Sequence, residues 1–89
     1  MLIALIARDK ADALQIRLDT RDDHIAYLKN TGVVSQAGPL LDGEDKMIGS
    51  LVILDVADMA AAEDWAANDP YAKAGLFQSV ELIPWKKVI

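Results

Sequence analysis

A single histidine, His24, and the segment that begins at Asp69 are the parts of this 89-residue sequence best suited to chemistry. The chain contains no cysteine, which excludes disulfides and thiolate chemistry. One imidazole without thiolates leaves a transition-metal site short of its usual ligands. Any catalysis must therefore rely on this imidazole and on carboxylates, and we predict neither a metal nor another cofactor.

His24 has two interpretations. An imidazole titrates close to neutral pH and is suited to accept and return protons, as a general base or acid does. A position near the N-terminus of its predicted helix would help to keep it neutral. However, His24 also borders the apolar helix face that contains Ile25 and Leu28, and a partly exposed structural histidine would show the same pattern. Both interpretations stay open.

Asp69 also has a structural and a functional interpretation. Aspartate before proline is a typical helix N-cap, and Pro70 is well suited to the first helical position. A carboxylate at this point could equally orient an imidazole. The two roles are compatible because a capping carboxylate is held rigidly. We predict His24 and Asp69 as the catalytic residues.

Candidates for substrate binding lie elsewhere in the chain. Ser50 could place a hydroxyl in a cleft, although Gly49 before it could simply mark a β-bulge. Arg17 could hold an anion by paired hydrogen bonds, but a solvent-exposed ion pair with a nearby aspartate is the interpretation that the sequence favours. Tyr71 is expected in the core or in a subunit interface. The predicted substrate-binding set is Ser50, Arg17, Gly38, Pro39 and Tyr71.

The elements that must position these residues follow a β-α-β-β-α-β order. Thr20 and Asp23 form a possible capping box, which predicts that the first long helix begins at Arg21 and ends at Gly32. Asp58 is the expected cap of the second helix. We predict strands at 2–7, 33–37, 48–54 and 77–85, helices at 21–30 and 59–68, and a short turn after Pro70. The second strand is expected to close at Gly38-Pro39, and Pro84 indicates that the last strand either lies at a sheet edge or ends there.

This order predicts one α+β domain over residues 1–89, with a ferredoxin-like four-stranded antiparallel sheet. The strands at 2–7 and 51–54 lack polar alternation, which is typical of strands covered on both faces, and this topology places them at the sheet centre. Two helices can cover only one sheet face, so the other would be a large apolar patch on a monomer. We therefore expect a homodimer that packs sheet against sheet. Whether dimers assemble further stays open.

Composition narrows the possible partners. The net charge of −5 argues against nucleic acid, which requires a basic surface. The apolar run over residues 1–7 is too short for a signal peptide or a membrane span, so we expect a soluble, cytoplasmic protein. The partners that remain are a small-molecule ligand and a second copy of the chain.

Several short motifs together resemble the YciI-like (YCII-related) family along nearly the whole chain. They are Arg17…Arg21-x-x-His24, Ala37-Gly38-Pro39, Gly49-Ser50, Asp69-Pro70-Tyr71-x-x-Ala74-Gly75 and Pro84-Trp85-Lys86-Lys87-Val88. The resemblance implies a ferredoxin-like fold that dimerises into an α/β barrel, and a site centred on His24 and Asp69. Two features depart from the family pattern: the loop at 41–47 is short, and Trp85 stands where phenylalanine is common.

Members of that family have been linked to lyase-type chemistry on aromatic substrates. The resemblance therefore implies an enzyme that performs acid–base chemistry of the lyase or isomerase type on a small organic substrate, aromatic or otherwise. The alternative is a non-catalytic binding or accessory module that uses the same cleft.

Overall fold

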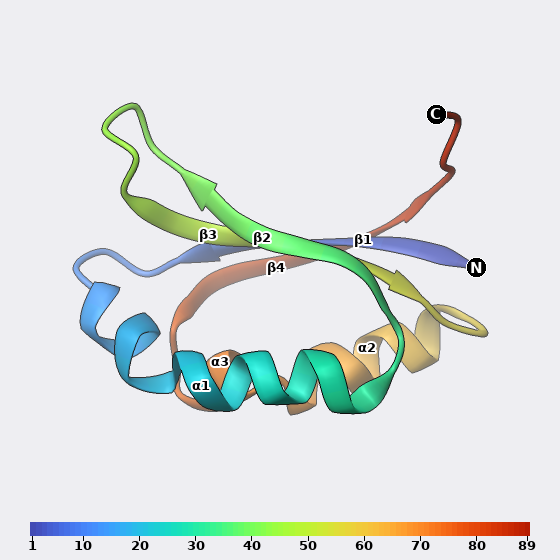
Figure 1. Ribbon diagram of the computed structural model, residues 1–89, viewed down its shortest axis with the longest axis horizontal. Helices are drawn as coiled ribbons and strands as arrows, with labels where there is room; N and C mark the ends of the chain where they lie inside the picture. Colours follow the sequence, from blue (N-terminus) through green and yellow to red (C-terminus); the bar gives the residue numbers. More distant parts are fainter.

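The computed structural model describes all 89 residues and shows one antiparallel sheet with its helices on one face (Figure 1). The elements are β1 (Leu2–Asp9), α1 (Leu14–Thr31), β2 (Val34–Leu41), β3 (Met47–Asp55), α2 (Met59–Asn68), α3 (Pro70–Lys73) and β4 (Phe77–Trp85). This confirms the predicted ferredoxin-like α+β arrangement.

The sheet has the strand order β2-β3-β1-β4, so β1 and β3 occupy the centre as predicted. Ile3 lies opposite Leu54, and Leu5 lies opposite Val52. Both edge strands contain a proline, which lacks the N–H that a central strand would need. Pro84 lies in β4, the edge strand predicted for it. The predicted end of the second strand at Gly38-Pro39 is wrong, since β2 continues to Leu41 along the opposite edge.

Alternation along the central strands separates a core face from an open face. The core face buries Ile3, Leu5 and Ala7 from β1 against the helices. Trp65 of α2 completes this cluster, and its indole N–H donates to the hydroxyl of Thr31 at 2.9 Å. The hydroxyl of Tyr27 donates to the carbonyl of Trp65 at 2.8 Å. These two bonds join α1 to α2 and fix the helix that carries His24.

The predicted start of the first helix is wrong. α1 begins at Leu14, and Thr20 lies inside the helix rather than at a cap. A Thr-x-x-Asp pattern forms a capping box only where backbone N–H groups lack helical partners, and here the preceding turn supplies those partners. His24 is therefore in the helix interior, and the suggested effect of a helix N-terminus on its charge does not apply. The C-terminal prediction is confirmed, because Gly32 ends the helix in a left-handed conformation with φ of 69°.

At Gly49 of β3, the neighbouring central strand β1 leaves no room for a side chain. A Cβ added there would overlap the backbone oxygen of Ala7, whereas one added at Gly38 would meet nothing within 4 Å. We expect Gly49→Ala to lower the free energy of unfolding by about 1–3 kcal/mol through overpacking. Gly38→Ala should be close to wild type. Urea denaturation of both variants checks this, and equal stability of the two would contradict it.

The face of the sheet away from the helices is uncovered (Figure 1). A groove on this open face is lined by Ala4, Ile6, Leu40, Leu51, Ile53 and Trp85, among others. Leu51 and Trp85 are exposed at 38% and 39%. The predicted uncovered apolar face is therefore present. Separately, none of the helices has the length and apolar character needed to cross a lipid bilayer.

Candidate active site

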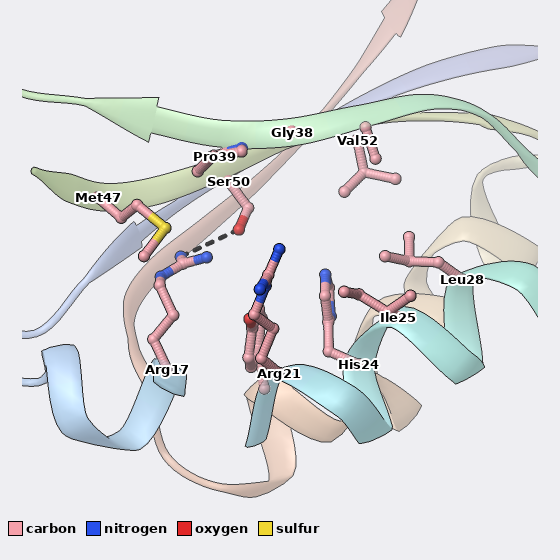
Figure 2. Close-up of a pocket in the computed structure, with 12 residues that line it drawn as sticks. Arg17, Arg21, His24, Ile25, Leu28, Gly38, Pro39, Met47, Ser50 and Val52 are labelled. Carbon is pink, nitrogen blue, oxygen red and sulfur yellow. Dashed lines mark hydrogen bonds between the residues drawn. The ribbon is translucent and has the colours of Figure 1, made fainter. Parts of the chain in front are cut away.

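A cavity of about 230 Å³ lies between α1 and the half of the sheet formed by β2 and β3 (Figure 2). Its polar lining consists of Arg17, Arg21, His24, Ser50 and Tyr71. The apolar lining includes Ile25, Leu28 and Val52. A dry cavity of roughly 150 Å³ can hold benzene, so this volume suits one substituted aromatic ring.

Asp69 fixes the orientation of His24. The Nδ1 atom of His24 lies 2.7 Å from Oδ1 of Asp69, and the same oxygen accepts the backbone N–H of Tyr71 at 3.0 Å. Because a carboxylate oxygen only accepts, the proton of the neutral imidazole belongs on Nδ1. The two residues are only 7% and 1% exposed. Nε2 is therefore the nitrogen left for a ligand, and the ring of His24 extends from α1 toward the cavity (Figure 2).

The capping role predicted for Asp69 also holds. Asp69 is the N-cap of α3, with Pro70 at the start of that helix, and its bond to the N–H of Tyr71 is the capping bond. One carboxylate oxygen thus connects the beginning of a short helix to the imidazole. This double use keeps the carboxylate rigid, since moving it would also leave a backbone N–H unpaired.

Tyr71 lies against both His24 and Arg17. Its ring stacks on the imidazole with centroids 3.8 Å apart and planes inclined by 14°. The guanidinium carbon of Arg17 lies 4.8 Å from the centroid of the same ring. Arg17 and His24 are seven residues apart, so they lie on one side of α1 about two turns from each other. Tyr71 fills the space between them, and its aromatic face attracts the guanidinium of Arg17.

Arg17 is held by a buried ion pair. Its Nε and Nη2 donate to the two carboxylate oxygens of Asp9 at 2.9 and 2.8 Å. Nη2 also donates to the hydroxyl of Ser50 at 3.0 Å. The side chains of Arg17 and Asp9 are 4% and 6% exposed. The interpretation of Arg17 as part of a solvent-exposed pair is therefore wrong, because the loop after β1 folds α1 back over Asp9.

The structure brings the predicted site residues together around one cavity. His24, Arg17, Gly38, Pro39, Ser50 and Tyr71 line it, and Asp69 lies behind His24. The alternative of a partly exposed His24 is wrong, because the residue is buried. The roles assigned to these residues in catalysis and binding stay predictions.

Sequence reasoning missed Asp9. The signal was present, because alternation from Ile3, Leu5 and Ala7 places Asp9 on the core face of β1. A carboxylate at a core position requires a cation or several donors beside it. No group of three or more His, Cys, Asp or Glu side chains is arranged to hold a metal ion.

Burial raises the pKa of the Tyr71 phenol above its ordinary value of 10.0, while Arg17, through its charge and a hydrogen bond, and Arg21 act in the opposite direction, and Asp69 adds the smallest contribution. Burial is also the main reason that the pKa of Tyr27 is raised. A raised pKa in the folded state adds stability below the unfolded pKa, and this stability is lost as the pH rises through the folded pKa.

We therefore expect the free energy of unfolding to fall above about pH 10, as the phenols ionise. The ultraviolet absorbance of tyrosinate should appear later in the folded protein than in urea. Tyr71→Phe should reduce the loss of stability at alkaline pH. Simultaneous titration of the tyrosines in the folded and unfolded protein would contradict this account.

The sequence profile of the YCII-related domain matches residues 1–86. The chain belongs to the YCII-related family. Within the family, it is 39% identical over 97 residues to Protein YciI of Escherichia coli O6:H1 (strain CFT073), covering 99% of both chains. It is 36% identical to an uncharacterized protein of Haemophilus influenzae (strain KW20), also covering 99% of both.

Two solved structures share the fold. The dehydrochlorinase TftG of Burkholderia phenoliruptrix AC1100, in complex with 2,5-dihydroxybenzoquinone, is 32% identical with a TM-score of 0.87. The match covers 97% of this chain and 94% of TftG, whose substrate is 5-chloro-2-hydroxyhydroquinone. An antibiotic biosynthesis monooxygenase matches with a TM-score of 0.58 and 16% identity, covering 98% of this chain and 100% of the other. This second likeness concerns the fold alone.

Proposed function

We propose that this YCII-related protein is a cofactor-independent enzyme in which His24, oriented by Asp69, moves protons on a small hydroxylated aromatic substrate. The observation that carries the proposal is the buried 2.7 Å contact between Nδ1 of His24 and Asp69. It leaves Nε2 as the proton acceptor at a cavity of about 230 Å³. A base with an orienting carboxylate is a recurrent arrangement for proton transfer.

The likeness to TftG supports elimination as the reaction type. When a chlorinated hydroxyhydroquinone loses HCl, two O–H bonds break and two C=O bonds form. One proton moves to the carbon that carries chlorine, and the other leaves with chloride, which takes the C–Cl electron pair. No external oxidant is required. His24 would accept the first hydroxyl proton, return it to the ring carbon and then accept the second.

Chloride release from 5-chloro-2-hydroxyhydroquinone tests the proposal, followed by a panel of halogenated and hydroxylated aromatic acids. We expect turnover by the wild type and a loss of about 10²- to 10⁴-fold in His24→Ala, the range for removal of a general base. A binding or accessory module would bind members of the panel with no chemical change. That result, or full turnover by His24→Ala, would overturn the proposal.

We also propose that two copies pack through their open faces to form a homodimer. Exposed Leu51, Ile83 and Trp85 on the sheet support this, because apolar surface gathered on a small domain is commonly covered by a partner. The wild type should sediment as a dimer at micromolar concentration. Leu51→Glu should yield monomers, whereas Leu18→Glu, at an exposed leucine of α1, should leave the dimer unchanged. A monomeric wild type would contradict the proposal.

A further inference from the structure

We propose that the cavity selects ligands that are already anions at neutral pH, and that Arg21 is the residue that determines this selection. The inference rests on the proposed function, because it names the charge of the ligands that the same site holds, and the hydroxyquinone left after the loss of HCl is such an anion. It is carried by the distribution of charge around the cavity and by the different partners of its two arginines.

The charge of the cavity is opposite to that of the protein. The chain has 14 acidic and 9 basic side chains, not counting histidine. Two of the basic ones, Arg17 and Arg21, line the cavity, and no aspartate or glutamate lines it. Asp69 lies on the far side of His24, with its Oδ1 occupied by the imidazole and by a backbone N–H. In an acidic protein, which repels anions in general, such a concave basic site concentrates them locally.

Arg17 does not by itself explain this positive charge. Its bidentate partner Asp9 is buried beside it, so the pair is close to neutral. Asp9 and Ser50 occupy Nε and Nη2, which leaves Nη1 as the donor that a ligand would share with Tyr71, since Arg17 also hydrogen-bonds to the Tyr71 side chain. We assign Arg17 to orienting a bound oxygen within the cavity, as a fixed hydrogen-bond donor.

Arg21 supplies the uncompensated charge. It lies one turn after Arg17 on α1, is exposed, and forms none of the ion pairs in the structure. Its side chain extends from the helix toward the cavity between Arg17 and His24 (Figure 2). An unpaired guanidinium offers paired N–H groups to a carboxylate or to two neighbouring oxygens of an ionised ring.

This arrangement suits a ring with an ionised oxygen at one side and a transferable proton at the other. Hydroxyquinones are examples, because a hydroxyl conjugated through the ring to a carbonyl behaves as a carboxylic acid and is ionised at neutral pH. Arg21 and Nη1 of Arg17 would hold the ionised oxygen. His24 lies one helical turn further along α1 and would face the remaining hydroxyl.

The test compares two probes that differ in charge. 2,5-Dihydroxybenzoquinone is anionic at neutral pH, whereas its dimethyl ether has the same ring and no charge. Binding is measured by calorimetry with the wild type, Arg21→Gln and Lys29→Gln. Lys29 is an exposed basic residue of the same helix that does not line the cavity. Lys29→Gln therefore changes the net charge of the protein by the same amount.

We expect the wild type to bind the anion and to bind its ether at least tenfold more weakly. Arg21→Gln should weaken anion binding by about tenfold, the size of one charge-assisted hydrogen bond at an accessible site. It should also reduce the dependence of affinity on salt concentration. Lys29→Gln should match the wild type. Equal binding of the two probes, or equal losses in the two variants, would overturn the inference.

Binding measurements on His24→Ala distinguish a failure of this inference from a failure of the proposed function. Anion binding that survives in His24→Ala, with its dependence on Arg21 intact, would support charge selection even if no compound is turned over. Turnover of neutral substrates with no effect of Arg21→Gln would leave the enzyme proposal standing and would overturn charge selection.

Discussion

Replacing Asp69 with asparagine should lower turnover by about two to four orders of magnitude and leave the protein folded. An asparagine oxygen can still accept the N–H of Tyr71, because asparagine caps helices about as well as aspartate. What disappears is the negative charge that would stabilise a protonated His24 during turnover. Steady-state chloride release, with thermal denaturation as the check on folding, measures both effects.

Asp58→Asn is the matched control for this substitution. Asp58 is also a helix N-cap, accepting the N–H of Ala61 at 2.8 Å, and it has no imidazole beside it. The Asp58→Asn variant should therefore have the stability and the turnover of the wild type. Asp69→Ala should in addition lose about 0.5–2 kcal/mol of stability with its cap.

A double-mutant cycle shows whether Asp69 acts through His24. If the two residues act as a unit, Asp69→Asn with His24→Ala should be little slower than either single variant. Fully additive losses in the double variant would mean that Asp69 acts independently of the imidazole, and the site assignment would be wrong.

Removing Asp9 should produce a large loss of stability. Asp9→Ala leaves the guanidinium of Arg17 buried without its partner, which typically costs about 3–5 kcal/mol. For a domain of this size that corresponds to a fall in melting temperature of roughly 12 °C or more. Urea and thermal denaturation measure the change.

Two further variants show whether the loss of stability comes from the unpaired guanidinium of Arg17. Asp19→Ala removes an exposed aspartate that only accepts from Gln15, and it should change stability by no more than about 0.5 kcal/mol. The pair Asp9→Leu with Arg17→Met should recover most of the stability, because apolar side chains of similar size can replace a buried ion pair. A stable Asp9→Ala would show that the guanidinium finds water or another partner.

The sheet could be predicted from the sequence because its signals are local. Uninterrupted apolar residues at Leu2–Ala7 and Leu51–Leu54 indicated central strands, and Pro84 indicated an edge. The start of α1 could not be predicted in this way, because Thr20 and Asp23 have the composition of a cap and only the turns before them decide whether it forms. The same error placed His24 at a helix end.

The candidate site was predictable in its residues but not in their contacts. His24 and Asp69 are 45 positions apart, so no local pattern links them. Only the resemblance to a known family predicted that they share one site. The partner of Arg17 was mistaken because sequence proximity favoured aspartates on its own helix. The real partner, Asp9, is eight residues earlier on a strand, and the turn between β1 and α1 brings it close. The stacking of Tyr71 on His24 likewise depends on how α3 packs against α1, which local pattern does not encode.

The tautomer of His24 tests the central claim most directly, because the claim requires Asp69 to hold the proton on Nδ1. The chain has one histidine, so the imidazole signals in a ¹⁵N NMR spectrum belong to His24 alone. In the neutral imidazole, we predict a protonated Nδ1 and an unprotonated Nε2, with loss of this preference in Asp69→Ala, which removes the oxygen that accepts from Nδ1. A proton on Nε2 in the wild type, or an unchanged tautomer preference in Asp69→Ala, would contradict the account.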